Sequence, residues 1–324
     1  MKTHLRKLVA LAGICVCALA QASQGTTPEL KVSPAHAWVD ASHMMLLDAA
    51  RAGSRIVAVG EHGLVLFSDD KGKTYKQASV VPISSTLTSV YFSDASHGWG
   101  VGQWGAIIAT QDGGKTWRIQ RADTSTDRPL FSVYFTDPLH GWAVGLWSLM
   151  LQTSDGGAHW SPVTLPPPPG STKADRNLFR IFGAADGTLY VAAEQGLVLR
   201  SRDHGTTWEY RKTGGKGSLW AGAVASDGTV LVGGLLGHLY ESHDGGDTWA
   251  AVETRTSSSI TDLAVTGDRV VGVGLDGLML SGTANSQDFD AKHREDRRPL
   301  TAIISLAGSN ATVLFAKDGV VSGD

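Results

Sequence analysis

The feature that most constrains the fold of this chain is a stretch of 31 residues that occurs twice. Leu87–Trp117 reads LTSVYFSDASHGWGVGQWGAIIATQDGGKTW, and Leu130–Trp160 reads LFSVYFTDPLHGWAVGLWSLMLQTSDGGAHW. The two terminal tryptophans lie 43 positions apart. A period near 40 residues with several short apolar runs in each unit is typical of β-propeller blades.

Weaker copies of this unit extend the repeat along the chain. Each copy opens with an apolar strand, continues through a second strand and a glycine-containing turn, and reaches a third strand. The units start near His43, Thr86, Pro129, Asn177, Ser218, Ser259 and Pro299. The sequence therefore predicts an all-β fold, a seven-bladed β-propeller of four-stranded antiparallel blades.

Five units end in a hairpin of the form S/T-x-D-x-G-x-x-aromatic. Its aspartates are Asp70, Asp112, Asp155, Asp203 and Asp244, and the sixth unit has lost the pattern at Ser281–Phe289. An aspartate in a tight turn accepts hydrogen bonds from the backbone N–H groups that follow it, and glycine supplies the positive φ. We interpret these aspartates as a structural Asp-box, in preference to catalytic groups or metal ligands.

The two ends of the repeat region are incomplete in complementary ways. Pro299–Asp324 supplies three strands and no fourth, while Glu29–Val39 precedes the first unit. We predict that this N-terminal segment adds the outer strand of the last blade and thereby closes the ring.

The first 22 residues have the pattern of a secretory signal peptide. Lys2, Arg6 and Lys7 precede the apolar run Leu8–Ala20, and small residues place cleavage after Ala20 or Ala22. A retained membrane anchor is the alternative. We expect residues 1–22 to be a signal peptide and residues 23–324 to be a single propeller that is exported to the periplasm. Both cysteines lie in the leader, so the mature chain has no thiol.

The charge of the chain argues against a nucleic-acid partner. The formal net charge is −3, and it becomes −6 when the three leader cations are removed. We find no zinc-ligand spacing and no glycine-rich loop that ends in lysine, so we expect neither a metal nor a cofactor.

One combined motif, D-x-x-H-G-W-x-V-G followed by G-x-I-x-x-T-x-D-G-G-x-T-W, is more specific than the Asp-box. It begins at Asp94 and His97 in one unit and at Asp137 and His140 in the next. The chain resembles the propeller family of photosystem II assembly and stability factors, which also has non-photosynthetic bacterial members. This resemblance implies a non-catalytic lumenal or periplasmic propeller that helps a membrane complex to assemble. In the photosynthetic members the partner is a newly made reaction-centre subunit, bound partly through an arginine-rich patch.

The connections between blades carry an excess of basic residues. Arg118–Arg128, Gly170–Arg176 and Glu209–Gly217 hold eight basic and four acidic side chains. These segments share one end of a meander with the turns between second and third strands, which carry exposed aromatic residues. We predict partner-binding residues at this end and near the channel: Arg121, Arg128, Arg176, Arg180, Arg211, Lys212, Trp104 and Trp147. Ordinary solvated charge, with aromatic residues tucked against neighbouring turns, is the alternative.

Two other functions compete with an assembly scaffold. The first keeps the fold and makes the protein a periplasmic accessory of an envelope export system. The second is a sialidase-like glycosidase, because those propellers also carry Asp-boxes, and Phe179–Phe182 partly matches their first arginine motif. Glu209 and Tyr210 are adjacent on a strand and cannot form the catalytic pair of such an enzyme. We predict a monomeric, non-enzymatic protein that binds a membrane protein or its exported segment.

Overall fold

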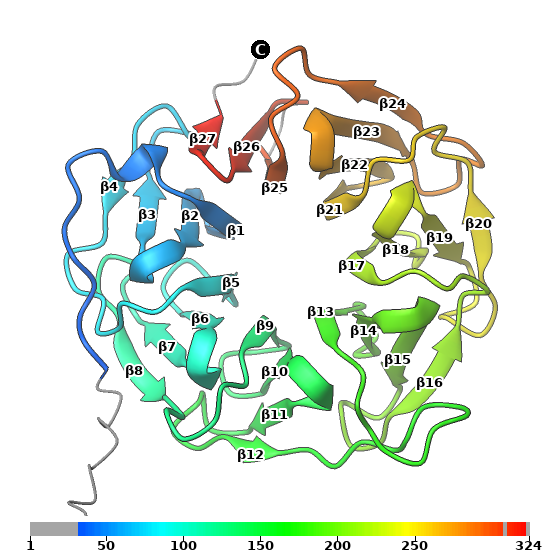
Figure 1. Ribbon diagram of the computed structural model, residues 1–324, viewed down its shortest axis with the longest axis horizontal. Coiled ribbons are helices and arrows are strands. Elements are labelled where there is room, and N and C mark those ends of the chain that lie inside the picture. Colours follow the sequence, from blue (N-terminus) through cyan, green and yellow to red (C-terminus); the bar gives the residue numbers. More distant parts are fainter. Residues whose placement is uncertain (1–31, 307–309, 322–324) are drawn as a thin grey trace, which may run out of the picture. The chain divides into compact units, whose positions relative to one another are not determined.

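A computed structural model describes residues 32–306 and 310–321 of the chain. Within this region the chain forms seven antiparallel sheets arranged around a ring, with the first strand of each sheet nearest the centre (Figure 1). The predicted seven-bladed propeller is confirmed. Residues 1–22, assigned to a signal peptide, lie outside the described residues.

Six sheets have four strands and the last has three among the described residues. Blades one to four comprise β1 (Leu46–Ala52), β2 (Arg55–Gly60), β3 (Val65–Ser68), β4 (Lys76–Gln77); β5 (Leu87–Phe92), β6 (Gly98–Gly102), β7 (Ile107–Thr110), β8 (Arg118–Arg121); β9 (Leu130–Phe135), β10 (Gly141–Gly145), β11 (Met150–Thr153), β12 (Ser161–Pro162); β13 (Leu178–Gly183), β14 (Leu189–Ala193), β15 (Leu197–Ser201) and β16 (Glu209–Lys212). Blades five to seven comprise β17 (Leu219–Val224), β18 (Val230–Gly234), β19 (Leu239–Ser242), β20 (Ala250–Val252); β21 (Ile260–Thr266), β22 (Arg269–Gly274), β23 (Leu278–Thr283), β24 (Asp290–His293); β25 (Leu300–Ser305), β26 (Thr312–Ala316) and β27 (Gly319–Val321).

The helical elements in the described region are short 3-10 turns. One precedes β1, and the others join the second and third strands of blades one to six: η1 (Ala41–His43), η2 (Glu61–Gly63), η3 (Gln103–Gly105), η4 (Leu146–Ser148), η5 (Glu194–Gly196), η6 (Leu235–Gly237) and η7 (Leu275–Gly277).

The glycines of the H-G-W-x-V-G motif are required by close packing within a blade. A Cβ on Gly98 would lie 2.4 Å from the ring of Phe92, and one on Gly102 would lie 2.0 Å from the carbonyl oxygen of Thr86. Larger residues would therefore push the first two strands apart. The second strand is buried throughout in blades two to five, because neighbouring sheets cover both of its faces.

An apolar core fills each interface between neighbouring blades, and the interface between the last blade and the first is no exception. Leu46, Ile56 and Leu66 of blade one pack with Ala302 and Phe315 of blade seven. The hydroxyl of Thr301 also donates a hydrogen bond to the carbonyl oxygen of Leu46, at 2.7 Å. Side-chain packing thus joins the two ends of the ring.

The predicted closure by Glu29–Val39 is not confirmed among the residues that the structure describes. Residues 32–39 form no strand, and they lie against blade one: the amide of Ala35 donates to the carbonyl of Val81 at 2.9 Å, and that of Trp38 donates to Gln77 Oε1 at 2.9 Å. These bonds satisfy backbone groups that the predicted strand would have paired with β27. Residues 29–31 lie outside the described residues.

The antiparallel order gives the ring two different ends. The five Asp-box turns follow the third strands at one end, which we call the Asp-box end. The turns η2 to η7 and the connections between blades lie at the other end, which we call the inter-blade end. Hydrogen bonds join the two kinds of segment there, such as Gln103 N to Thr86 O and Leu146 N to Pro129 O, both at 3.0 Å.

Candidate partner-binding face

The carboxylates at the Asp-box end accept hydrogen bonds from residues of their own turns. Asp112 accepts hydrogen bonds from the hydroxyl of Thr110 (2.8 Å) and from both the amide (3.0 Å) and the hydroxyl (2.6 Å) of Thr116. The corresponding bonds recur at Asp70, Asp155, Asp203 and Asp244. Hydrogen bonding to the carboxylate favours its charged form, so the bonds from Thr207 lower the pKa of Asp203 to about 2.

The aromatic residue after each Asp-box packs into the neighbouring interface. Trp117 is 3% exposed among blade-one residues such as Val57 and Phe67, and its indole N–H donates to Gly114 O at 3.0 Å. In blade six, Phe289 is buried at this place although the Asp-box itself is lost. The Asp-box end therefore uses its polar and aromatic groups to hold the blades together.

The turns of the inter-blade end combine left-handed backbone with exposed apolar side chains. The central residue of each turn from η2 to η7 has a left-handed conformation, with φ between 51° and 61°: His62, Trp104, Trp147, Gln195, Leu236 and Asp276. A left-handed conformation costs a residue with a Cβ about 1–2 kcal/mol. Trp147 and Leu236 are nonetheless 57% and 58% exposed, so burial of their side chains does not offset this cost. Strained backbone that presents an exposed apolar side chain is characteristic of functional sites.

Five of the eight predicted partner-binding residues come together over blades two to four. Arg121 donates to Gly105 O at 2.6 Å and pairs with Asp123, whose amide donates to Trp104 O. Arg128 donates to Trp147 O at 3.2 Å. The amide of Ser148 donates to Arg176 O at 2.7 Å. Each tryptophan of η3 and η4 thus lies beside an arginine from a connection between blades.

These arginines differ in how far their charge is already compensated. Arg121 and Arg176 form ion pairs with Asp123 and Asp175, whereas Arg128 forms none with any residue that the structure describes. The side chain of Arg128 is half-buried and is bonded only to the backbone carbonyl of Trp147 among the described residues, so its guanidinium can add a charge-assisted bond to an acidic partner.

Arg211 and Lys212 lie apart from this group, on β16. The guanidinium of Arg211 contacts Asp247 in the next blade and Gly246 O (3.2 Å). Asp247 also binds Arg202 and Arg200, and Arg200 is only 1% exposed. Arg211 is thus part of an ionic network between blades four and five. Lys212 is exposed.

Arg180 lies on β13, the innermost strand of blade four, and it bridges two other blades. Its guanidinium is 3.2 Å from Asp48 of β1 and 3.7 Å from Asp262 of β21. Burial, opposed by Arg180 and reinforced by Asp48, raises the pKa of Asp262 to about 6. The charge of Arg180 is thus compensated by acids of two other blades, which argues against a role for this residue in partner binding.

Sequence reasoning missed apolar residues at the inter-blade end of blade one. Trp38 is 40% exposed and packs 5.9 Å from the ring of His62, and Val39 beside it is fully exposed. It also missed the stacked rings of Phe131 and Phe179 on adjacent innermost strands, whose centroids are 5.7 Å apart. The Phe131–Phe179 pair had a signal in the sequence, because both residues follow the first leucine of an opening strand.

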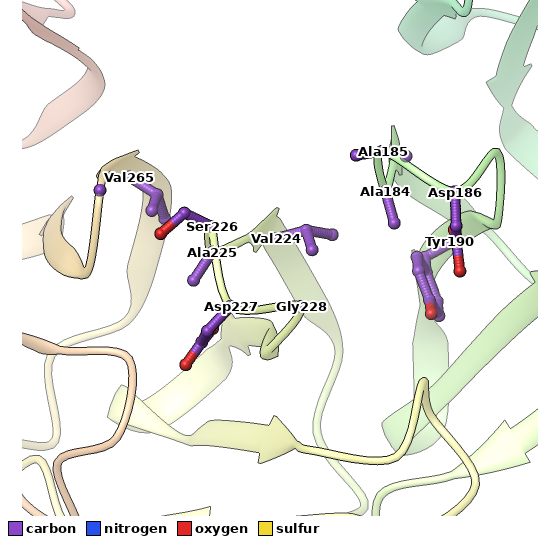
Figure 2. A pocket seen from close by; sticks show the side chains of 12 residues that line it. Ala184, Ala185, Asp186, Tyr190, Val224, Ala225, Ser226, Asp227, Gly228 and Val265 are labelled. Atoms are coloured by element: carbon purple, nitrogen blue, oxygen red, sulfur yellow. The ribbon is translucent and has the colours of Figure 1, made fainter.

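A hollow of about 560 Å³ lies between the first turns of blades four and five and the end of β21 (Figure 2). Small residues such as Ala184, Ala185 and Ser226 line it, together with Asp186 and Asp227. Asp227 accepts bonds from Thr229 N (2.9 Å) and Asn285 Nδ2 (3.0 Å), and the backbone bond from Thr229 is the main cause of its lowered pKa. A glycosidase acid requires a raised pKa, and the arginines that would hold a sugar carboxylate do not line this hollow.

The two residues of the rival glycosidase pair face opposite ways. Glu209 binds Arg200 on the side of blade five, at 2.5 Å, whereas Tyr210 packs with the core between blades three and four. Among the described residues, no set of three histidine or acidic side chains converges as metal ligands would, and no helix has the length and apolar character needed to cross a bilayer.

Comparison with known proteins identifies the family of the chain. The model of the family "Photosynthesis system II assembly factor YCF48" matches residues 77–319. The chain belongs to this family. No curated protein matches the sequence. Membership confirms the resemblance that the repeated D-x-x-H-G-W motif suggested.

Solved structures of YCF48 share the fold of this family member. A structure titled "YCF48 bound to D1 peptide" has a TM-score of 0.69 at 17% identity, covering 90% of this chain and 98% of that one. YCF48 from Cyanidioschyzon merolae has a TM-score of 0.67 at 16% identity, covering 86% and 94%. At this identity the likeness extends to the propeller and not to individual residues.

Proposed function

We propose that this YCF48-family protein is a non-catalytic, exported scaffold that aids the assembly or stability of a membrane protein complex. Family membership supports an assembly role, and the relative bound to a D1 peptide supports a segment of a membrane protein as the partner. The leader-like residues 1–22 support export to the periplasm. We propose that the protein acts as a monomer.

The observation that carries the choice of surface is the pairing of Trp147 with Arg128. Trp147 is exposed on strained backbone, and Arg128, which has no acidic partner in the described part of the chain, donates to its carbonyl oxygen. Aromatic and arginine side chains contribute most of the binding energy at protein interfaces. The partner segment would place an apolar side chain on Trp147 and an acidic group on Arg128.

Charge reversal tests this surface. The full-length tagged protein is used to recover the partner from detergent-solubilised membranes of the native host. We expect Arg128→Glu to reduce the recovered partner at least tenfold, because truncation of an interfacial charge contact costs about 2 kcal/mol or more. Arg51→Glu is the matched control: among the described residues, the side chain of Arg51 at the Asp-box end also bonds only to a carbonyl oxygen, that of Gly53. Equal recovery by both variants would refute this surface.

The glycosidase alternative has its own test. Hydrolysis of a fluorogenic sialoside by the purified protein, abolished by Arg180→Ala, would overturn the non-catalytic role. We expect no hydrolysis, because Arg180 is already paired with Asp48 and Asp262 and is not available to bind a sugar carboxylate.

A further inference from the structure

The interface between blade seven and blade one lacks an outer strand among the described residues. In blade one, Ala78 N donates to Val65 O at 2.9 Å, and in blade three, Val163 N donates to Met150 O at 2.9 Å. Val320 of β27 is the counterpart of Val65 of β3, because Val320 pairs with Phe315 of β26 as Val65 pairs with Val59 of β2. In the alternating ladder of an antiparallel pair, its N–H and C=O then point away from β26. In the described region no strand accepts or donates there.

A hollow of about 280 Å³ lies beside this edge. Ser42, His43, Gly72, Lys73, Thr74, Tyr75 and Val320 line it. The hydroxyl of Tyr75 is buried and has no hydrogen-bond partner among the described residues. Leaving such a group unpaired costs about 1–3 kcal/mol.

Other interfaces show what fills the corresponding space. In blade two, Gln120 of the outer strand β8 donates to Gly156 O at 2.8 Å and accepts from Trp160 Nε1 at 3.3 Å, both in the Asp-box hairpin of the next blade. Tyr75 is the residue of blade one that matches Trp160. An outer strand on blade seven would therefore bring a polar side chain to the hydroxyl of Tyr75.

The residue after the Asp-box glycine has the opposite charge at this interface from its counterpart at the interface between blades four and five. There, Arg211 of the outer strand binds Asp247, the residue that follows the Asp-box glycine Gly246. In blade one the residue after Gly72 is Lys73, which is exposed and lies within ion-pairing distance of no carboxylate that the structure describes. A strand that fits beside Lys73 requires an acidic side chain where β16 has Arg211.

The N-terminal segment leads away from this edge. Its described residues bond to blade one and to the connection that follows, Ala35 N to Val81 O and Ser33 Oγ to Ser84 Oγ (2.7 Å). We propose that the edge at Val320 accepts an extended strand from a second protein, with an acidic side chain facing Lys73. This acceptor edge is separate from the surface around Trp147, and its test does not depend on that proposal.

The probe is an acetylated and amidated peptide with the sequence of Glu209–Thr213 and the change Arg211→Glu, EYEKT. The unmodified sequence EYRKT is the matched control. Both are added at millimolar concentration to the full chain, and hydrogen exchange of the Val320 amide is followed by NMR. We expect EYEKT to slow exchange and EYRKT to require about tenfold more peptide for the same effect, because like charges then meet. In the Lys73→Glu variant, EYRKT should slow exchange at a lower concentration than EYEKT.

Two further variants locate the strand. Val320→Pro removes an N–H that the β26–β27 ladder does not use, so the fold should persist while peptide binding is lost. Tyr75→Phe should weaken both peptides equally. The proposal is overturned if the Val320 amide is already protected without peptide, if neither peptide slows its exchange, or if Lys73→Glu leaves their order unchanged.

Discussion

Two tryptophans at opposite ends of the ring show how the same repeat serves two purposes. Trp117 at the Asp-box end is 3% exposed, and its indole N–H is bonded to Gly114 O. Trp147 at the inter-blade end is 57% exposed and stands on backbone with a φ of 51°. The first side chain stabilises the interface between blades, whereas the second contributes little burial. The difference supports our proposal that the Asp-box end stabilises the fold and the inter-blade end binds the partner.

Substitution of the two tryptophans should give the largest contrast. We expect Trp117→Ala to lower the free energy of unfolding by about 3–5 kcal/mol, because it leaves a cavity between blades one and two. Trp147→Gly should leave it unchanged or raise it by about 1 kcal/mol, because glycine adopts positive φ without strain. Urea unfolding followed by circular dichroism measures both. A loss above 1 kcal/mol for Trp147→Gly would show that this residue is structural.

The buried acid of the channel should produce the next largest effect, a dependence of stability on pH. Burial raises the pKa of Asp262 to about 6, whereas an unfolded aspartate titrates near pH 4. The folded state therefore holds the proton more tightly, and the free energy of unfolding should fall by up to about 3 kcal/mol as the pH rises from 4 to 7.

Asp262→Asn should flatten this slope when unfolding is measured across the same pH range. The Asp-box carboxylates have lowered pKa values, so their contribution is lost only as the pH falls below about 4, and the two effects are separable. A slope that is identical in the wild type and in Asp262→Asn would contradict the assignment.

Loss of one Asp-box carboxylate should have a smaller effect. We expect Asp112→Ala to cost about 1–2 kcal/mol, because it removes the acceptor for Thr110, Lys115 and Thr116. Asp127→Ala, which changes an exposed acid at the inter-blade end, should stay within about 0.5 kcal/mol. Equal midpoints of urea unfolding for the two variants would remove the distinction between the two ends.

Periodic features of the sequence predicted the fold, whereas contacts between residues of different blades limited the prediction of the site. The spacing of Trp117 and Trp160 gives the repeat directly, because each blade is a local unit. The ionic contact of Arg211 with Asp247 joins residues of different blades, and no pattern within one unit reveals it. The path of Val32–Val39 could not be predicted for a similar reason, because its hydrogen-bond partners, Gln77 of β4 and Val81 of the connection that follows, are distant in the sequence.

The most direct test of the division between the two ends measures how much membrane partner the full-length protein recovers. Exposed apolar residues are removed from one end at a time. The double variant Trp147→Ala, Leu236→Ala changes the inter-blade end, and Leu139→Ala removes a similarly exposed side chain (53%) in the β9–β10 turn at the other end. We predict at least a tenfold loss of partner for the double variant, with unchanged unfolding, and no loss for Leu139→Ala. Full recovery by the double variant, or an equal loss with Leu139→Ala, would contradict the account.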